Sequence, residues 1–350
     1  MKLAIDGGTP VRAEFLSYAR PKIEEAAIAE AVEAMRSGWL TTGPRVKKFE
    51  EKFAVYCGIP YGVAVNSCTA ALHLALLAAG VGPGDEVITT PMTFVATAEA
   101  IQYCGATPVL ADVDPRYLNL DPACVAEKIT VKTKAIVPVH FAGTACPMDE
   151  LLALARQHNL KVVADAAHAS ETQYRGKNVA HYGDFVCYSF YATKNLPMGE
   201  GGLVATRDEA GANLVRELRL HGMNAQAWKR YSSKGFTLSE VVRQGYKYNL
   251  TDVAAALGLH HLAVLEQNLI YRTRLVERYR AGLADLPEVA TLPVPDYCRP
   301  AYHLFAIRFA LDRLRVDRNQ LASALQEENI GVSVHFHALP LHPFYREQYG

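Results

Sequence analysis

An apolar segment passes directly into a helical pattern in the stretch Tyr61-Gly-Val-Ala-Val-Asn-Ser-Cys-Thr-Ala-Ala-Leu-His-Leu-Ala-Leu76. The alternation recurs along the chain, where further short runs rich in β-branched residues are separated by segments with apolar residues at helical spacing. Continuous apolar strands that alternate with helices are typical of a mainly parallel sheet covered on both faces. The sequence therefore predicts an α/β fold.

The expected elements are bounded as follows. Strands are predicted over 61–65, 86–89, 108–113, 135–139, 161–164, 185–189 and 203–206, and helices over 21–35, 69–79, 95–103, 122–129 and 149–158. A polar loop is expected over 225–242, followed by one long helix over 251–280 with Thr251 as its N-cap. A second, smaller unit is expected after Pro295, with a strand over 302–309, a helix over 318–328 and a strand over 332–336.

The composition is that of an ordinary globular protein. Lys and Arg number 36 and so do Asp and Glu, so no net field draws the chain to nucleic acid or to a membrane surface. No apolar run approaches a membrane span, and the first residues lack the apolar core of a signal peptide. The seven cysteines are dispersed, which favours reduced thiols in the cytoplasm. No metal site is expected, because the clustered histidines lack partners at metal-ligand spacing.

One lysine stands in an unusual setting, Ser189-Phe-Tyr-Ala-Thr-Lys194-Asn-Leu-Pro-Met-Gly-Glu-Gly-Gly202. It follows an apolar strand and precedes a glycine-rich turn. A lysine in such a position becomes a Schiff-base nucleophile if burial or a nearby cation lowers its pKa. The alternative is a solvated turn lysine.

Polar side chains follow three other expected strands. Ser67 and Thr69 lie at the start of a helix, where free N–H groups bind phosphate, although simple N-capping by Ser67 explains them as well. Asp165, with His168 three residues later, ends a buried strand; it is either a helix cap or the partner of a protonated ring nitrogen. Phe94 offers a ring for stacking, or packs in the core.

Taken together with Ser189 as a further phosphate ligand, these residues supply what pyridoxal phosphate requires. They comprise a phosphate-binding turn, a carboxylate for the ring nitrogen, an aromatic face and an amine. The ends of parallel strands meet at one edge of a sheet, where ligands bind in such folds. The sequence thus predicts a pyridoxal-phosphate site at this edge.

The chain resembles the DegT/DnrJ/EryC1/StrS family of pyridoxal-phosphate sugar aminotransferases. The likeness runs through the segments 37–44, 82–88, 105–108, 138–140, 165–169, 189–195, 199–202 and 219–222. It implies the aspartate-aminotransferase (type I) fold, with a mainly parallel seven-stranded sheet in a large domain over 1–265. A smaller C-terminal α/β domain over 266–350 is implied as well, shorter than in relatives.

The resemblance also implies roles for individual residues. Lys194 would form the internal aldimine, Asp165 would pair with the pyridinium nitrogen, and Phe94 would stack on the ring with His168 beside it. Phosphate would be bound by Ser67, Cys68, Thr69 and Ser189, with Cys68 in place of the usual glycine. Relatives are dimers with shared active sites, which implies that Lys247 or Asn249 reaches the partner's phosphate.

The segment 245–252 and the tail around His335 look like the subgroup that makes UDP-4-amino-4-deoxy-L-arabinose for lipid A, a lipopolysaccharide component. Substrate contacts are then expected from the surrounding loops: Trp39, Thr41, Thr42, His221, Lys229, Arg230 and His335.

The implied reaction is a ping-pong transamination that cycles between pyridoxal and pyridoxamine phosphate. The amino donor would be L-glutamate and the acceptor a UDP- or dTDP-linked 4-keto sugar. Two alternatives are an aminotransferase for a small aldehyde, ketone or polyamine, and a non-catalytic regulatory module on the same fold. Relatives that dehydrate sugars carry histidine in place of the lysine, so Lys194 indicates transamination.

Overall fold

The computed structural model describes residues 2–223 and 240–349. A seven-stranded sheet lies at its centre, in the order β1-β9-β8-β5-β4-β2-β3. Its strands are β1 (Tyr61–Val65), β2 (Glu86–Thr89), β3 (Thr107–Leu110), β4 (Thr133–Ile136), β5 (Lys161–Asp165), β8 (Phe185–Ser189) and β9 (Gly202–Thr206). Only β9 runs antiparallel to its neighbours, and the other pairs are parallel. The predicted α/β fold and mainly parallel sheet are confirmed.

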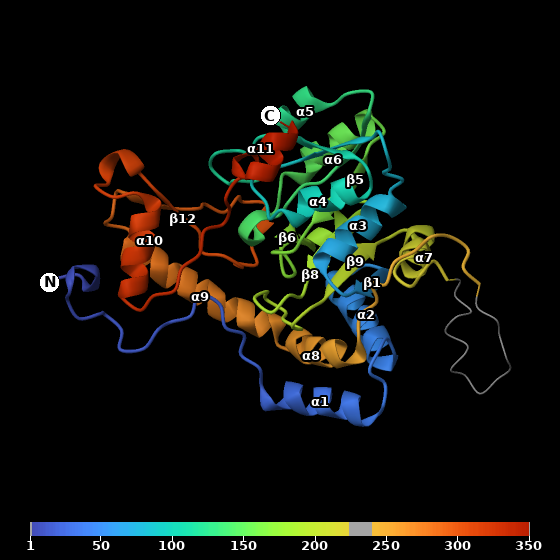
Figure 1. The fold of residues 1–350 in the computed structure, drawn as a ribbon, viewed down its shortest axis with the longest axis horizontal. Coiled ribbons are helices and arrows are strands. Elements are labelled where there is room, and N and C mark those ends of the chain that lie inside the picture. The colour runs from blue at the N-terminus through green and yellow to red at the C-terminus, as the bar shows by residue number, and fades with distance from the viewer. Residues whose placement is uncertain (1, 224–239, 350) are drawn as a thin grey trace.

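Helices cover both faces of this sheet (Figure 1). Alternate strand residues point to opposite faces, because side chains in a strand have a period of two. On one face, Val63 and Cys187 belong to a core shared with α3 (Cys68–Ala78), α4 (Ala96–Tyr103) and α7 (Glu209–Leu218). The other face packs against α2 (Pro44–Cys57), α5 (Pro122–Lys128), α6 (Met148–Gln157) and α8 (Asp252–Ala263).

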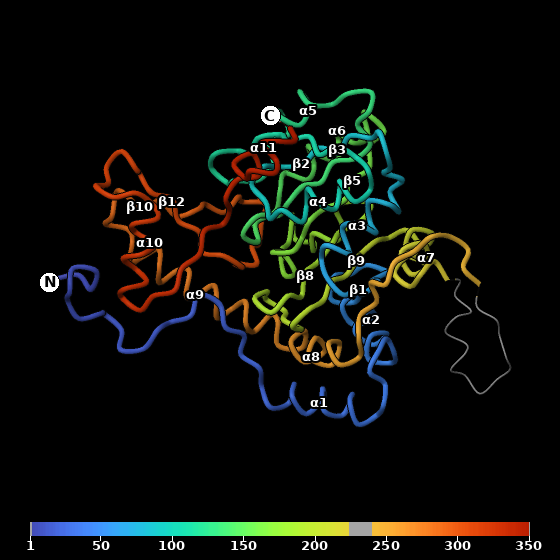
Figure 2. The backbone as a smooth tube through the Cα atoms, viewed as in Figure 1, coloured from blue at the N-terminus to red at the C-terminus, as the bar shows by residue number. Residues whose placement is uncertain are grey.

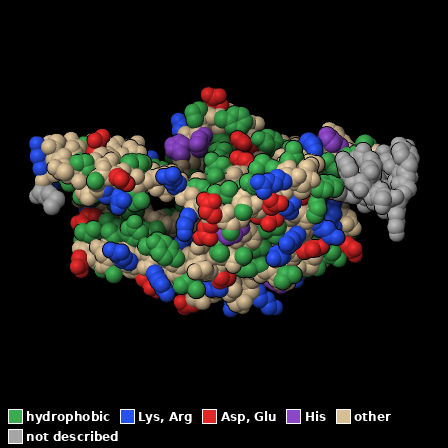
Figure 3. All heavy atoms as spheres, turned by 90° about the horizontal axis from the view of Figure 1, so that it is seen from below, with side chains coloured by type: hydrophobic (Ala, Val, Ile, Leu, Met, Phe, Trp, Pro, Cys, Tyr) green, Lys and Arg blue, Asp and Glu red, His purple; other side chains and the backbone are tan. Residues whose placement is uncertain are grey.

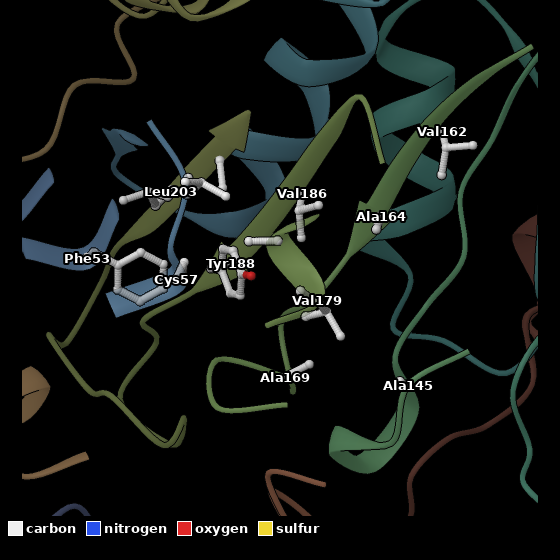
Figure 4. Close-up of a cluster of buried hydrophobic side chains, with 14 of the residues drawn as sticks. Phe53, Cys57, Ala145, Val162, Ala164, Ala169, Val179, Val186, Tyr188 and Leu203 are labelled. Carbon is white, nitrogen blue, oxygen red and sulfur yellow. The ribbon is translucent and has the colours of Figure 1, made fainter. Parts of the chain in front are cut away.

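The second core contains the larger aromatic side chains (Figure 4). Phe53 from α2 meets Tyr188 of β8 edge to face, with ring centroids 5.0 Å apart. Helix α2 was not among the predicted elements, although its buried residues have helical spacing: Val46, Phe49, Phe53 and Cys57. Burial of such an apolar stripe supplies most of the stability of a helix in a protein.

The predicted long helix over 251–280 is wrong in one respect. The structure has two helices there, α8 and α9 (Leu265–Leu283), bent by 60° at Val264. Thr251 is the N-cap, as predicted, and its hydroxyl accepts from the N–H of Ala254. No single helix of the described residues is long and apolar enough to cross a membrane, and this bent pair meets the criterion only when both are counted together.

An N-terminal arm runs beside the C-terminal unit before it reaches α1 (Glu25–Arg36) (Figure 2). The arm begins with a short 3-10 helix, Ala4–Asp6. Both oxygens of Glu328 hold it, since they accept from the N–H groups of Ala4 and Val11 at 2.8 and 2.7 Å. Leu16 then forms a parallel bridge with Ile330.

The C-terminal unit is smaller and only partly as predicted. It contains β10 (Val289–Thr291) paired with β12 (Ile307–Phe309), and α10 (Arg318–Glu327). The strand predicted over 302–309 is thus confined to its last three residues, and no strand forms over 332–336. A further small sheet joins β11 (Cys298–Arg299) to β6 (Gln173–Tyr174) and β7 (Lys177–Asn178).

The last helix, α11 (Pro343–Tyr349), returns to the large unit (Figure 1). Tyr345 packs with Leu339 against Ala98 of α4. Short 3-10 turns complete the described elements: Phe141–Gly143, Val179–His181, Leu311–Arg313 and Leu339–Leu341. Acidic and basic side chains are interspersed on the face seen in Figure 3, in keeping with a net charge of zero.

Candidate active site

Four neighbouring strands, β1, β9, β8 and β5, bring the predicted cofactor residues to one edge of the sheet. Gly202, the first residue of β9, is paired with Val65 at the end of β1 and with Ser189 at the end of β8. In the parallel pair β5–β8, Asp165 is paired with Cys187. The turns that follow these strand ends therefore start from one edge, as expected for a binding site in such a sheet.

Asp165 is a buried carboxylate with two hydrogen-bond donors. Its side chain is 6% exposed; Oδ2 accepts from the Thr97 hydroxyl at 2.8 Å and Oδ1 from the Ala167 N–H at 3.0 Å. Burial raises the pKa of Asp165, while these hydrogen bonds and the amine of Lys194 oppose the rise. A buried carboxylate of this kind favours a cationic partner.

Lys194 lies in the turn after β8, where its backbone N–H donates to the carbonyl of Tyr191 at 2.9 Å. Its side chain is partly buried and makes no ion pair within residues 2–223 and 240–349. Burial lowers the pKa of Lys194, and the negative charge of Asp165 acts in the opposite direction. The lowered pKa increases the neutral fraction of the amine, which is the nucleophilic form.

The turn between β1 and α3 approaches the backbone of β9 very closely. The Ser67 hydroxyl caps α3 by accepting from the N–H of Ala70 at 3.1 Å. A Cβ at Gly202 would come within 2.4 Å of the carbonyl oxygen of Ser67 and 2.7 Å of the nitrogen of Cys68. The N–H groups of Cys68 and Thr69 lie in the first helical turn, which has no intrahelical acceptors for them.

Ser67 thus does cap the helix, and the free first-turn N–H groups remain suited to an anion as well. Ser189 is 5% exposed, and its hydroxyl accepts from the N–H of Tyr191 at 3.4 Å. Burial raises the pKa of the Cys68 thiol well above its usual value, and Asp165 adds to the effect. Cys68 is therefore a neutral thiol at physiological pH.

Aromatic rings line the other side of the site. Phe94 is 61% exposed, so the alternative of a core phenylalanine is wrong. Its ring lies 6.3 Å from that of Phe336, which in turn stacks near His168 at 5.9 Å and 19°. His168 is 8% exposed, and its Nδ1 is buried without a partner in the described part of the chain. Burial lowers the pKa of His168 well below its usual value, which keeps the ring neutral.

The residues predicted to reach a partner subunit lie together with two predicted substrate residues. Nζ of Lys247 donates to Oδ1 of Asn249 at 2.6 Å. Nδ2 of Asn249 donates to the hydroxyls of Thr41 and Thr42 at 3.2 and 2.7 Å. Asn249 also forms an antiparallel bridge with Val65, so this cluster adjoins the end of β1 in its own chain.

The other predicted substrate residues are dispersed. Trp39 is partly buried, and a Cβ at Gly43 would come within 2.9 Å of its ring. His221 is exposed and has a positive φ of 58°. Lys229 and Arg230 lie outside the described residues.

His335 contacts the N-terminal arm, because its ring nitrogens lie 3.3 Å from the hydroxyl of Tyr18. Burial lowers the pKa of His335. The adjacent Phe336 lies near Phe94 and His168, so the C-terminal unit reaches the same site.

Sequence reasoning missed a buried polar network beside Lys194. Asn195 bonds to Glu171, His303 and the carbonyl of Ala301, and Glu171 also forms an ion pair with Arg272. Glu171 is fully buried. No local motif identifies this network, because its members are distributed between residues 171 and 303 and meet only in the fold.

The site fits pyridoxal phosphate. The buried carboxylate of Asp165 suits a protonated ring nitrogen, and the helix N-terminus at Cys68 suits a phosphate. The partly buried amine of Lys194 is the third component. Nδ1 of His168 has no hydrogen-bond partner among the described residues and could make a further polar contact with the cofactor.

A model of the DegT/DnrJ/EryC1/StrS aminotransferase family matches residues 21–350. The chain belongs to this family. The family-level resemblance noted from the sequence motifs is therefore confirmed. The finer likeness to the lipid A subgroup stays a prediction.

Among curated relatives of this family, the spore coat polysaccharide biosynthesis protein SpsC of Bacillus subtilis is 48% identical over 340 residues. The alignment covers 97% of this chain and 87% of SpsC. Among solved structures, the putative sugar aminotransferase Spr1654 of Streptococcus pneumoniae in its PLP form has a TM-score of 0.87 and 32% identity. That match covers 96% of this chain and 88% of Spr1654.

A second solved structure, DesI in the presence of its TDP-sugar product, also has a TM-score of 0.87 and 32% identity, over 98% of this chain and 85% of DesI. Spr1654 has been solved in a PMP form too, with the same TM-score. This DegT/DnrJ/EryC1/StrS protein is therefore a pyridoxal-phosphate-dependent sugar aminotransferase with the type I fold.

Proposed function

We propose that this enzyme transfers the amino group of L-glutamate to a 4-keto sugar nucleotide, UDP- or dTDP-linked, by a ping-pong mechanism. One observation supports it most directly: a carboxylate and an amine lie at the ends of two adjacent strands. The buried carboxylate of Asp165 ends β5, and the desolvated amine of Lys194 follows β8. The TDP-sugar product of DesI supports a nucleotide-linked acceptor.

When bound, pyridoxal phosphate supplies an aldehyde that takes up amines and a ring that delocalises negative charge. Nζ of Lys194 would hold the cofactor. The same amine, when free, would take the proton from the donor's Cα and later return one, as general base and acid. Burial lowers the pKa of Lys194, which favours the neutral amine that acts as the base.

Asp165 would keep the ring nitrogen protonated through its carboxylate, which Thr97 and Ala167 hold in place. The phosphate of the cofactor would be held at the start of α3 by Ser67, by the N–H groups of Cys68 and Thr69, and by Ser189. Phe94 would stack on the ring, with His168 beside it.

The acceptor is proposed to bind among the loops that surround this site. Its contacts are assigned to Trp39, Thr41, Thr42, His221, Lys229, Arg230 and His335.

We propose that the enzyme is a homodimer in which Lys247 or Asn249 completes the phosphate site of the partner. Mixed dimers test this. Lys194→Ala and Asn249→Ala would each be inactive alone, whereas a mixed dimer has one site with both residues intact. Restored activity on mixing would support active sites shared between subunits. No restored activity would mean that Asn249 acts within its own chain, where it already contacts Thr42.

The proposed reaction is tested by visible absorption of the loaded enzyme. Adding L-glutamate should bleach the yellow protein and release one equivalent of 2-oxoglutarate. The second half-reaction is then assayed with UDP- and dTDP-4-keto sugars, and with small aldehydes and polyamine-derived aldehydes as competing acceptors. A yellow protein indifferent to L-glutamate would contradict the donor, and amination of aldehydes alone would contradict the sugar acceptor.

The cellular setting is proposed as cytoplasmic, since all seven cysteines are free thiols in the structure. Supply of aminated sugars for lipopolysaccharide is the corresponding role proposed from the subgroup likeness.

A further inference from the structure

The side chain of Asn195, next to Lys194, is held by four hydrogen bonds. Its Nδ2 lies 3.2 and 3.0 Å from the two carboxylate oxygens of Glu171 and 3.2 Å from the carbonyl oxygen of Ala301. A backbone carbonyl can only accept, so this contact fixes which end of the amide carries the nitrogen. Oδ1 of Asn195 therefore faces Nδ1 of His303, 3.0 Å away.

This contact fixes the tautomer of His303. The amide oxygen can only accept, so Nδ1 of His303 carries the proton that it donates. Burial lowers the pKa of His303 well below its usual value, and the charge of Lys194 adds to the effect. The ring is therefore neutral, with a proton on Nδ1 and a lone pair on Nε2.

The ring of His303 also supports that of His168. Their centroids lie 4.4 Å apart, with the planes tilted by 35°. The ring of Phe336 also lies near that of His168, with centroids 5.9 Å apart. A single imidazole thus contacts both the residue after Lys194 and the ring of His168.

The hydrogen-bond network of Asn195 continues to helix α9. Glu171 is fully buried and forms an ion pair with Arg272 of α9, whose Nε also donates to the carbonyl of Ala301 at 3.2 Å. Because α9 extends from the large unit toward the C-terminal unit (Figure 1), the network links the Lys194 turn to that helix.

We propose that His303 is a positioning residue for the reaction at Lys194: as the neutral Nδ1–H tautomer it fixes Asn195, and its ring fixes His168. This inference rests on the proposed function, in which Lys194 carries the amine chemistry. His303 sets the orientation of the turn that presents the amine.

Two substitutions separate the hydrogen bond from the ring contact. His303→Phe keeps a ring against His168 but removes the donor to Asn195. His303→Asn keeps a donor near the position of Nδ1 and removes the ring. The readouts are the rate of bleaching by L-glutamate in a stopped-flow experiment and the affinity of the cofactor-free protein for pyridoxal phosphate, from quenching of intrinsic fluorescence.

The expected result is slower bleaching by about 10- to 100-fold in His303→Phe, the usual effect of losing a supporting hydrogen bond at such a site. Cofactor affinity should change by less than about threefold, because His303 is not one of the phosphate or ring-nitrogen ligands. His303→Asn should recover part of the rate. An unchanged rate in His303→Phe, or no recovery in His303→Asn, would overturn the proposal.

A second measurement needs neither donor nor acceptor. Nitrogen-15 NMR of the cofactor-free protein, with the His303 signals assigned by their loss in His303→Phe, should show the proton on Nδ1 at neutral pH. A proton on Nε2, or a doubly protonated ring, would contradict the inference. Failure of L-glutamate to bleach the enzyme would instead contradict the proposed donor, and the NMR result would still decide the tautomer.

Discussion

The hydroxyl of Thr97 donates to Oδ2 of Asp165 at 2.8 Å, and the hydroxyl of Thr93 lies 2.7 Å from that of Thr97. All three side chains are buried, so this short chain of hydrogen bonds fixes the carboxylate that ends β5. Burial nevertheless raises the pKa of Asp165, so the cofactor-free protein carries an incompletely compensated charge at neutral pH. This charge is what the protonated ring of the cofactor would neutralise.

The cofactor-free protein should therefore be stabilised by Asp165→Asn at neutral pH. A carboxyl whose pKa is higher in the folded state contributes stability below its unfolded pKa and loses it as pH rises through the folded pKa. We expect the variant to melt about 2 °C or more above the wild type at pH 8, with the difference vanishing near pH 4. Differential scanning calorimetry across this range measures it.

Asp6→Asn is the matched control, since Asp6 is exposed, and should show no such divergence. A cofactor-free Asp165→Asn protein that is less stable than the wild type at pH 8 would show that the carboxylate is fully compensated by its neighbours. The same substitution should weaken the cofactor's reactivity toward amines.

His140 should make the protein sensitive to acid. Its ring is fully buried, Nδ1 accepts from the N–H of Cys146 at 3.1 Å, and burial lowers the pKa of His140 to about 4. Because the pKa of His140 is lower in the folded protein than in the unfolded chain, its neutral ring contributes fully to stability above the unfolded pKa, near 6.5. This contribution is lost as the pH falls from there toward 4. The loss is on the order of 3 kcal/mol.

His140→Asn, which keeps an acceptor for Cys146, should unfold in urea with a smaller loss of stability between pH 7 and pH 4 than the wild type. His158→Asn, at an exposed position, should behave as the wild type does. Parallel losses in His140→Asn and the wild type would assign the acid sensitivity to other groups.

Gly202→Ala should disrupt the turn at the start of α3. The added Cβ would lie 2.4 Å from the Ser67 carbonyl oxygen, and backbone atoms cannot move aside as a flexible side chain would. We expect a destabilisation of about 3 kcal/mol or more and weaker binding of pyridoxal phosphate. Chemical unfolding and fluorescence titration measure the two effects.

Gly82→Ala is the control, because no atom lies within 4 Å of a Cβ there, and it should change stability by less than about 1 kcal/mol. Similar stabilities for the two variants would contradict the close packing of β9 on the Ser67 turn.

Features that depend on a short stretch of sequence are predictable from the sequence alone. The central strands are predictable because each is a short apolar run between helices. Three of them have a polar candidate residue at or just after the strand end: Asp165 at the end of β5, Ser189 at the end of β8 and Ser67 after β1. The break between α8 and α9 is not predictable from the sequence, because no Gly or Pro marks Val264.

The remaining errors have a similar physical cause. The run 332–336 has the composition of a strand, but a strand also needs a partner, which the sequence does not reveal. His303 is remote in the chain from Asn195, so only the fold shows that they meet. The proposed boundary between residues 265 and 266 coincides with the start of α9 and stays a prediction.

The most direct test of the account is to identify the lysine that binds the cofactor. Reduction of the loaded enzyme with borohydride, followed by proteolysis and mass spectrometry, should place the phosphopyridoxyl group on the peptide that contains Lys194. In Lys194→Arg, which keeps the positive charge, the label should be absent. A label on Lys247 or any other lysine, with Lys194 unmodified, would contradict the assignment of the reactive amine.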